Sequence, residues 1–251
     1  MHKTWFNQVN TNFNQAAANY NESAGLQKRT ASKLAKICSN YPIKNGLWVD
    51  LGSGTGLLAK SLEDLNPNQY VLRLDNSKQM IDQHSEKSTK QLWDLNNGLP
   101  KWPKKPNLLA SSFVLHWLNN PPGQLREWFD SLSSDGWIAL AMPIKGSFPE
   151  WYEAAKQSDL TCTALDLPSH DSLTRVVPIQ SILYNKIEII QQTADKATSL
   201  LKPMIKVGAH SSHKENLSIS DWRHLLSLWP VDHKKKQFSL SWYIQFLLIK
   251  R

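Results

Sequence analysis

The sequence is poor in cysteine and has no long apolar run. Its two cysteines, Cys38 and Cys162, lie far apart and lack metal or redox spacing, which excludes a disulfide framework and predicts a reducing, cytoplasmic setting. No apolar run approaches the ~20 residues needed to span a bilayer, and residues 1–5 begin no signal region, so we expect a soluble protein. The eight histidines form no cluster with metal-ligand spacing. We therefore predict no bound metal and no membrane contact.

The chain is basic, with 29 Lys and Arg residues against 21 Asp and Glu residues and a formal net charge of +8. Such a balance favours acidic partners, for example nucleic acid or an acidic carrier protein. The basic residues are dispersed, and the densest run, 233–236, is typical of a solvated hairpin loop. An RNA-binding or RNA-modifying protein would gather Lys and Arg with aromatic residues on one face. We keep that class as the weaker alternative and predict no nucleic-acid partner.

Three alternating glycines, Gly52, Gly54 and Gly56, follow Asp50 and a short apolar run, and a helix-like stretch comes after them. Glycine has no Cβ, so such a turn lets a ligand approach the backbone closely. The helix that follows points unpaired N–H groups at that ligand. The pattern predicts a nucleotide-bearing cofactor at the carboxyl end of a parallel strand.

The glycine spacing separates the candidate cofactors. A dinucleotide fingerprint is Gly-x-Gly-x-x-Gly and a P-loop ends in Gly-Lys-Ser/Thr, whereas here the pattern is Gly-x-Gly-x-Gly and no lysine follows Gly56. The segment Asp50–Gly56 resembles the first motif of class I S-adenosylmethionine (SAM) methyltransferases. An acidic residue beside the loop suits the ammonium of SAM and would repel a pyrophosphate.

Two further acids fit a SAM site. The strand-like segment 70–75 ends in Asp75, whose carboxylate can accept both ribose hydroxyls, or alternatively caps the next helix. Met80 on that helix is placed against the adenine. Asp94 matches the family position that reaches the adenine amino group, unless it is a solvated loop acid. The resemblance implies that Leu95 and Ser111 also line the cofactor site.

Strand-like and helix-like segments alternate along the chain, which predicts a Rossmann-like α/β fold with a mostly parallel, seven-stranded sheet. By resemblance to class I methyltransferases, the last strand runs antiparallel in a hairpin with the sixth. The predicted strands are 46–51, 70–75, 90–93, 107–113, 137–142, 187–191 and 238–249. The predicted helices are 5–39, 57–63, 77–86, 121–132, 148–160, 194–206 and 219–228, and segment 161–183 is rich in loops.

The length suits one domain, residues 1–251. We divide it into an N-terminal helical cap (1–45), a cofactor-binding core (46–142), and a substrate cover with the C-terminal strands (143–251). The first and last parts would cover the sheet edge where ligands bind.

The cap and cover resemble the BioC family, the malonyl-[acyl-carrier-protein] O-methyltransferases of biotin synthesis. The resemblance starts with Phe13, an alanine-rich turn, Tyr20 and Gln27. It continues through 115–118, 145–151, 200–209, 229–230 and the last strand. It implies methyl transfer from SAM to the free carboxylate of a malonyl thioester on an acyl carrier protein. A carboxylate is ionised at neutral pH, since simple carboxyl groups titrate near ~4, so catalysis would need alignment and water exclusion but no general base.

The resemblance also places candidate residues in the acceptor site. Tyr20 would hold a carboxylate oxygen, or else anchor the N-terminal helix. Lys145 would offset the malonyl charge, or else be a surface lysine. Gln27 would help to seat the cofactor, and His116 and Trp117 would line the pocket, although Trp117 equally suits the core. The alternative acceptors are another small acid or a quinone-type compound.

Overall fold

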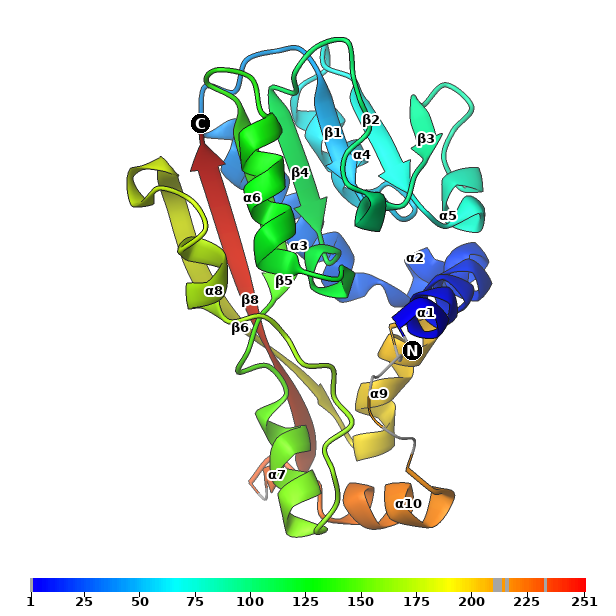
Figure 1. Ribbon diagram of the computed structural model, residues 1–251. Helices are drawn as coiled ribbons and strands as arrows, with labels where there is room; N and C mark the ends of the chain where they lie inside the picture. The colour runs from blue at the N-terminus through cyan, green and yellow to red at the C-terminus, as the bar shows by residue number, and fades with distance from the viewer. Residues whose placement is uncertain (1, 210–213, 215–216, 233) are drawn as a thin grey trace.

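The computed structural model, which describes residues 2–209, 214, 217–232 and 234–251, contains one mixed sheet (Figure 1). The strand order is β3-β2-β1-β4-β5-β8-β6, with β7 beside β8. The strands are β1 (Trp48–Leu51), β2 (Val71–Asp75), β3 (Lys90–Leu92), β4 (Leu108–Ser112), β5 (Trp137–Pro143), β6 (Ile182–Ala194), β7 (Val231–Asp232) and β8 (Gln237–Lys250). Strands β1 to β5 pair in parallel, and β8 runs antiparallel between β5 and β6. The predicted fold class is confirmed, with the two-residue β7 as an addition.

Helices cover both faces of the sheet and its carboxyl edge. The α-helices are α1 (His2–Ala16), α2 (Tyr20–Ser23), α3 (Gly25–Ser39), α4 (Leu57–Leu65), α5 (Lys78–Asp82), α6 (Pro121–Ser131), α7 (Pro149–Gln157), α8 (His170–Thr174), α9 (Ala197–Lys206) and α10 (Ile219–Ser227). Short 3-10 helices are η1 (Ala17–Asn19), η2 (Leu95–Asn97), η3 (Leu115–Trp117) and η4 (Ile179–Ser181). In Figure 1, α1 and α9 lie beyond the carboxyl ends of the parallel strands. Helices α7 and α10 lie farther away, at the end of the antiparallel strands β6 and β8 that projects from the sheet. No described helix is long and apolar enough to cross a membrane.

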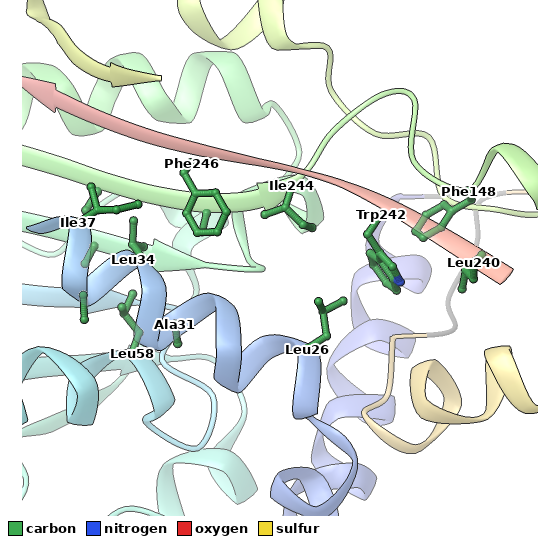
Figure 2. Close-up of a cluster of buried hydrophobic side chains, with 14 of the residues drawn as sticks. Leu26, Ala31, Leu34, Ile37, Leu58, Phe148, Leu240, Trp242, Ile244 and Phe246 are labelled. Atoms are coloured by element: carbon green, nitrogen blue, oxygen red, sulfur yellow. The ribbon is translucent and has the colours of Figure 1, made fainter. Parts of the chain in front are cut away.

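The core has two layers, one on each face of the sheet. On one face, α3 packs against β8, where Leu34 meets the fully buried Phe246 (Figure 2). On the other face, Trp128 of α6 packs against β1, β4 and β5. Because β1 and β5 are buried along their whole length, their sequences read as nearly continuous apolar runs. That is why these strands could be located from sequence.

Strand β6, which pairs antiparallel with β8, is much longer than the sequence suggested, whereas β8 nearly matches its predicted bounds. The sixth strand was expected over 187–191 and spans Ile182–Ala194, paired on one side only. As an edge strand it carries exposed polar residues, including Asn185 and Lys186, which interrupt the apolar pattern. The segment expected to be loop-rich contains α8. The long β6 and β8 strands extend to the end of the molecule where α7 and α10 lie (Figure 1).

The basic run before the last strand forms an exposed turn between β7 and β8 at Lys234–Lys236, as expected, and His233 lies outside the described residues. Arg73, an uncommon residue for the interior of a parallel strand, is buried on β2. Its guanidinium bonds to both carboxylate oxygens of Glu63 at 3.0 and 2.6 Å. Arg73 on β2 thus forms a bidentate ion pair with Glu63 on α4, which compensates the buried charge within the sheet.

Candidate active site

The glycine loop, residues 52–56, joins β1 to α4, and its three glycines are needed for different structural reasons. All three have positive φ, at +71° for Gly52, +52° for Gly54 and +89° for Gly56. A Cβ on Gly52 would collide with the Val114 side chain, and one on Gly56 would lie 2.8 Å from the ring of His84. A Cβ on Gly54 would meet nothing within 4 Å. Gly52 and Gly56 are therefore required by packing, whereas Gly54 presents bare backbone to an open cavity.

Asp75, at the end of β2, lies beside this loop. Its Oδ2 accepts a hydrogen bond from the Gly54 N–H at 2.7 Å, and its Oδ1 accepts one from the Ser77 N–H at 2.8 Å. The cap of α5 is Ser77, whose Oγ accepts from the Met80 N–H at 3.1 Å. The helix-cap role considered for Asp75 thus belongs to Ser77. Asp75 fixes the loop and also lines the cavity beside Met80.

Asp50, at the end of β1, is 1% exposed and lines the same cavity. Its Oδ2 accepts from the Ala59 N–H at 2.9 Å, in the first turns of α4. Burial raises the pKa of Asp50 to about 7, although the Ala59 bond and the charge of Arg73 oppose the rise. A buried carboxyl group in this state favours a cationic ligand group beside it. The ammonium of SAM supplies such a group, so the residues present fit the expected cofactor.

The cofactor cavity extends from the glycine loop across the ends of β1 and β2 to η2. Its lining includes Gly52, Ser53, Gly54, Thr55, Asp50, Asp75, Met80, Trp93, Asp94, Leu95 and Gln27, with Phe6, Val9 and Phe13 of α1 as a cover. Asp94 caps η2 by accepting from the Asn96 N–H at 2.9 Å through Oδ1. The structure thus brings together nearly all of the expected cofactor residues.

Two expected cofactor residues lie outside that lining. Gly56 packs against His84, as described above. Ser111 on β4 is 2% exposed, and its Oγ donates to the Leu51 carbonyl at 2.8 Å. The next residue, Ser112, lines the cavity, and its buried Oγ has no hydrogen-bond partner among the described residues. Successive strand residues face opposite ways, so choosing Ser111 placed the hydroxyl on the wrong side.

A second cavity adjoins the first. The two share Phe13, Tyr20, Gln27, Phe113 and Trp117. The second is completed by His116, Pro143, Phe148, Leu165, Leu167, Met204, Val207, Ala209 and Trp242. Its walls are aromatic and aliphatic, and no lysine or arginine occurs among its described lining residues. It is the candidate acceptor cavity.

The titratable groups of the acceptor cavity are held neutral. His116 is 8% exposed, and burial lowers its pKa to about 3. Its Nδ1 has no hydrogen-bond partner in the described part of the chain. Burial raises the pKa of Tyr20, and the nearby charge of Asp75 raises it further. At neutral pH, therefore, His116 is an uncharged imidazole and Tyr20 is a phenol that can donate a hydrogen bond.

Trp117 and Lys145 were also predicted to lie in the acceptor site. Trp117 lines both cavities. Its ring stacks on Trp5, with 6.1 Å between ring centroids, and meets Phe13 edge-on at 5.6 Å. Trp117 therefore both lines the pocket and packs against α1. Lys145 is exposed and lines neither cavity. Its backbone N–H bonds to the Pro168 carbonyl. The structure does not bring Lys145 together with the other site residues.

Sequence reasoning missed three aromatic walls of the acceptor cavity. Phe148 and Trp242 meet edge-on, with their ring centroids 4.6 Å apart (Figure 2). The ring centroid of Phe113 lies 6.0 Å from that of Trp242. Phe113 and Phe148 both have positive φ, at 61° and 66°. Positive φ is uncommon for bulky residues and marks a constrained position. Phe148 and Trp242 lie in segments that the family resemblance covered, and Phe113 ends a predicted strand, but nothing in the sequence showed that these three side chains meet in one cavity.

The sequence is similar to those of known methyltransferases. Trans-aconitate 2-methyltransferase of Mycobacterium tuberculosis is 33% identical over 98 residues, which are 38% of this chain and 36% of that protein. The enzyme of that name from Mycolicibacterium gilvum is 25% identical over 160 residues, 61% of this chain and 54% of that protein. The matched part thus spans between about a third and about half of these relatives.

Solved structures share the fold. The YcgJ protein of Bacillus subtilis superposes with a TM-score of 0.59 at 12% identity, over 87% of this chain and 98% of that one. A SAM-dependent methyltransferase from Archaeoglobus fulgidus gives a TM-score of 0.54 at 14% identity, over 89% and 94% of the two chains. The family described as "Methyltransferase domain" matches residues 23–177, more than half of the sequence. The chain belongs to this methyltransferase family, and its cofactor is SAM.

Proposed function

We propose that this protein transfers the SAM methyl group to a carboxylate oxygen of an organic acid that carries a single negative charge. A malonyl thioester, bound to an acyl carrier protein as in biotin synthesis, is the acceptor that the Phe13–Gln27 segment supports. The proposal rests on one observation. The two titratable groups of the acceptor cavity, His116 and Tyr20, are both neutral and unsuited to remove a proton.

The absence of a suitable base selects among acceptors. Methylation of a phenol, a thiol or an ammonium group requires loss of a proton, and the best general base has a pKa near the operating pH. The pKa of His116, about 3, is too low, and the raised pKa of Tyr20 keeps the phenol protonated. A carboxylate with an ordinary pKa near ~4 arrives without its proton. It is the acceptor that this cavity can use directly.

The charge balance selects among acids. Among its described lining residues the cavity has no cationic side chain, so the sulfonium of SAM is the nearby positive charge available to the acceptor. The single positive charge of the sulfonium balances the charge of one carboxylate. Each further carboxylate would be buried without a partner, at a cost of several kcal/mol. This disfavours a tricarboxylate such as trans-aconitate, after which the relatives are named, and favours a half-acid thioester.

The roles of the chain's own residues follow. When bound, SAM supplies an electrophilic methyl group on a positively charged sulfur. Asp50 would bind the ammonium, Asp75 would accept the ribose hydroxyls, and Tyr20 would donate a hydrogen bond to the acceptor carboxylate, since all three line the cavities. The aromatic walls exclude water, which strips solvation from the weakly nucleophilic carboxylate and strengthens its electrostatic interactions. Catalysis then consists of alignment within a dry cavity.

The test is a substrate panel assayed by mass spectrometry. The purified protein is incubated with SAM and with malonyl-acyl carrier protein, a malonyl-pantetheine thioester or trans-aconitate. We expect a methyl ester on the thioesters and little on trans-aconitate, with Asp75→Ala as an inactive control. Rapid methylation of trans-aconitate would contradict the single-charge argument and leave carboxylate transfer standing. Methylation of amines or phenols alone would contradict both.

A further inference from the structure

His84 lies beneath the glycine loop, between α5 and β3, and lines neither cavity. It is 8% exposed. Its Nε2 is 2.7 Å from the Gly54 carbonyl oxygen and 3.5 Å from the Ser53 Oγ. A carbonyl oxygen only accepts hydrogen bonds, so Nε2 carries the proton and donates it to Gly54.

The Gly54 peptide is therefore held on both sides. Its N–H donates to Asp75 at 2.7 Å and its carbonyl accepts from His84 at the same distance. This is the residue whose missing side chain faces open space in the cofactor cavity. The two bonds fix the orientation of the backbone that SAM must approach.

Packing and charge keep the imidazole in this place. A Cβ on Gly56 would lie 2.8 Å from Cε1 and 2.9 Å from Nδ1 of His84, so the ring fills the space beneath the loop. Burial lowers the pKa of His84 more than the Gly54 bond raises it, and the charges of Arg73 and Lys90 act in the same direction as burial. The ring is thus neutral at pH 7, with one donor and one acceptor nitrogen.

We propose that His84 is a positioning residue of the cofactor site, which sets the affinity for SAM through its hydrogen bond to the Gly54 carbonyl. It acts without lining the cavity, because the loop stands between the ring and the cofactor. The inference depends on the cofactor alone, so it stands or falls independently of the acceptor.

The test compares three variants by calorimetric titration with S-adenosylhomocysteine, in the absence of any acceptor. His84→Phe keeps the ring volume and removes the donor, so affinity should fall about tenfold. His84→Gln places an amide N–H at a similar reach and should recover affinity to within about threefold of wild type. Gln83→Leu, at the exposed neighbouring position, should bind like wild type.

Two readouts separate positioning from general destabilisation. At saturating SAM the KM for the acceptor should not change in His84→Phe. Amide hydrogen exchange in the apo protein should accelerate at residues 53–56 and remain unchanged in β4 and β5. If His84→Phe does not fold, His84→Asn replaces it, because its amide is too short to reach the Gly54 carbonyl. Wild-type affinity in the donor-less variant, or equal losses in that variant and His84→Gln, would overturn the proposal.

Discussion

Asp50 offers the sharpest test of how the cofactor site is built, because its ionised carboxylate is costly to the folded protein. The pKa of this carboxyl is raised from 3.8 to about 7. A shift of this size, at about 1.4 kcal/mol per unit, corresponds to about 4 kcal/mol between the protonated and ionised forms. Asp50→Asn keeps an oxygen for the Ala59 N–H and carries no charge at any pH.

The sign of the effect follows from linkage. Between about pH 4 and pH 7 the folded protein binds a proton at Asp50 that the unfolded chain has released, so this group's contribution to stability is complete below pH 4 and declines as pH rises through 7. Without cofactor, Asp50→Asn should therefore unfold with a free energy about 2–4 kcal/mol higher than wild type at pH 8. The difference should shrink toward zero near pH 4.5.

The assay is urea unfolding of both proteins, free of cofactor, from pH 4.5 to 8.5, with the difference between them plotted against pH. Titrating groups that do not interact with Asp50 cancel in that difference, so the coupled neighbours Arg73, Asp75 and Glu63 are the groups that can add to it. The same variant should bind S-adenosylhomocysteine at least tenfold more weakly, because the ammonium loses its carboxylate. By this reasoning, burial of the Asp50 carboxylate destabilises the cofactor-free protein. A variant less stable than wild type at pH 8, or a stability difference that does not vary with pH, would refute that destabilisation.

The other residues of the site give further expectations. Gly54→Ala should cost about 1 kcal/mol of unfolding free energy for its positive φ, yet weaken S-adenosylhomocysteine binding at least tenfold in calorimetry, since its Cβ enters the cofactor cavity. Tyr20→Phe should leave that affinity within about twofold and lower kcat about tenfold in a steady-state assay, the loss expected of one hydrogen bond to a charged group. Lys145→Ala should keep kcat within about twofold, because the amine lies outside both cavities. A large kcat loss there would restore the catalytic role predicted from sequence.

The cofactor half of the site was predictable because its residues sit where parallel strands end. Asp50 and Asp75 each close a strand whose apolar run marks its position, and parallel strands bring their carboxyl ends to one edge. The errors there are of register. Ser111 was chosen where Ser112 lines the cavity, and a shift of one residue along a strand exchanges its two faces. A family resemblance carried by short segments fixes the register of a strand to within a residue or two, which is too coarse to assign a hydroxyl.

The acceptor half was not predictable in the same way, because its defining property is collective. Phe13, His116, Met204 and Trp242 come from four distant segments. They meet beyond the carboxyl ends of the parallel strands, past which β6 and β8 extend (Figure 1). No short sequence motif shows that the described lining of the acceptor cavity lacks a cationic side chain. Our proposal for the acceptor depends on that lack, since a buried second carboxylate would have no partner. The donor site is therefore encoded by a local glycine motif, whereas under our proposal the acceptor is selected by the charge balance of the folded surroundings, which no local motif encodes.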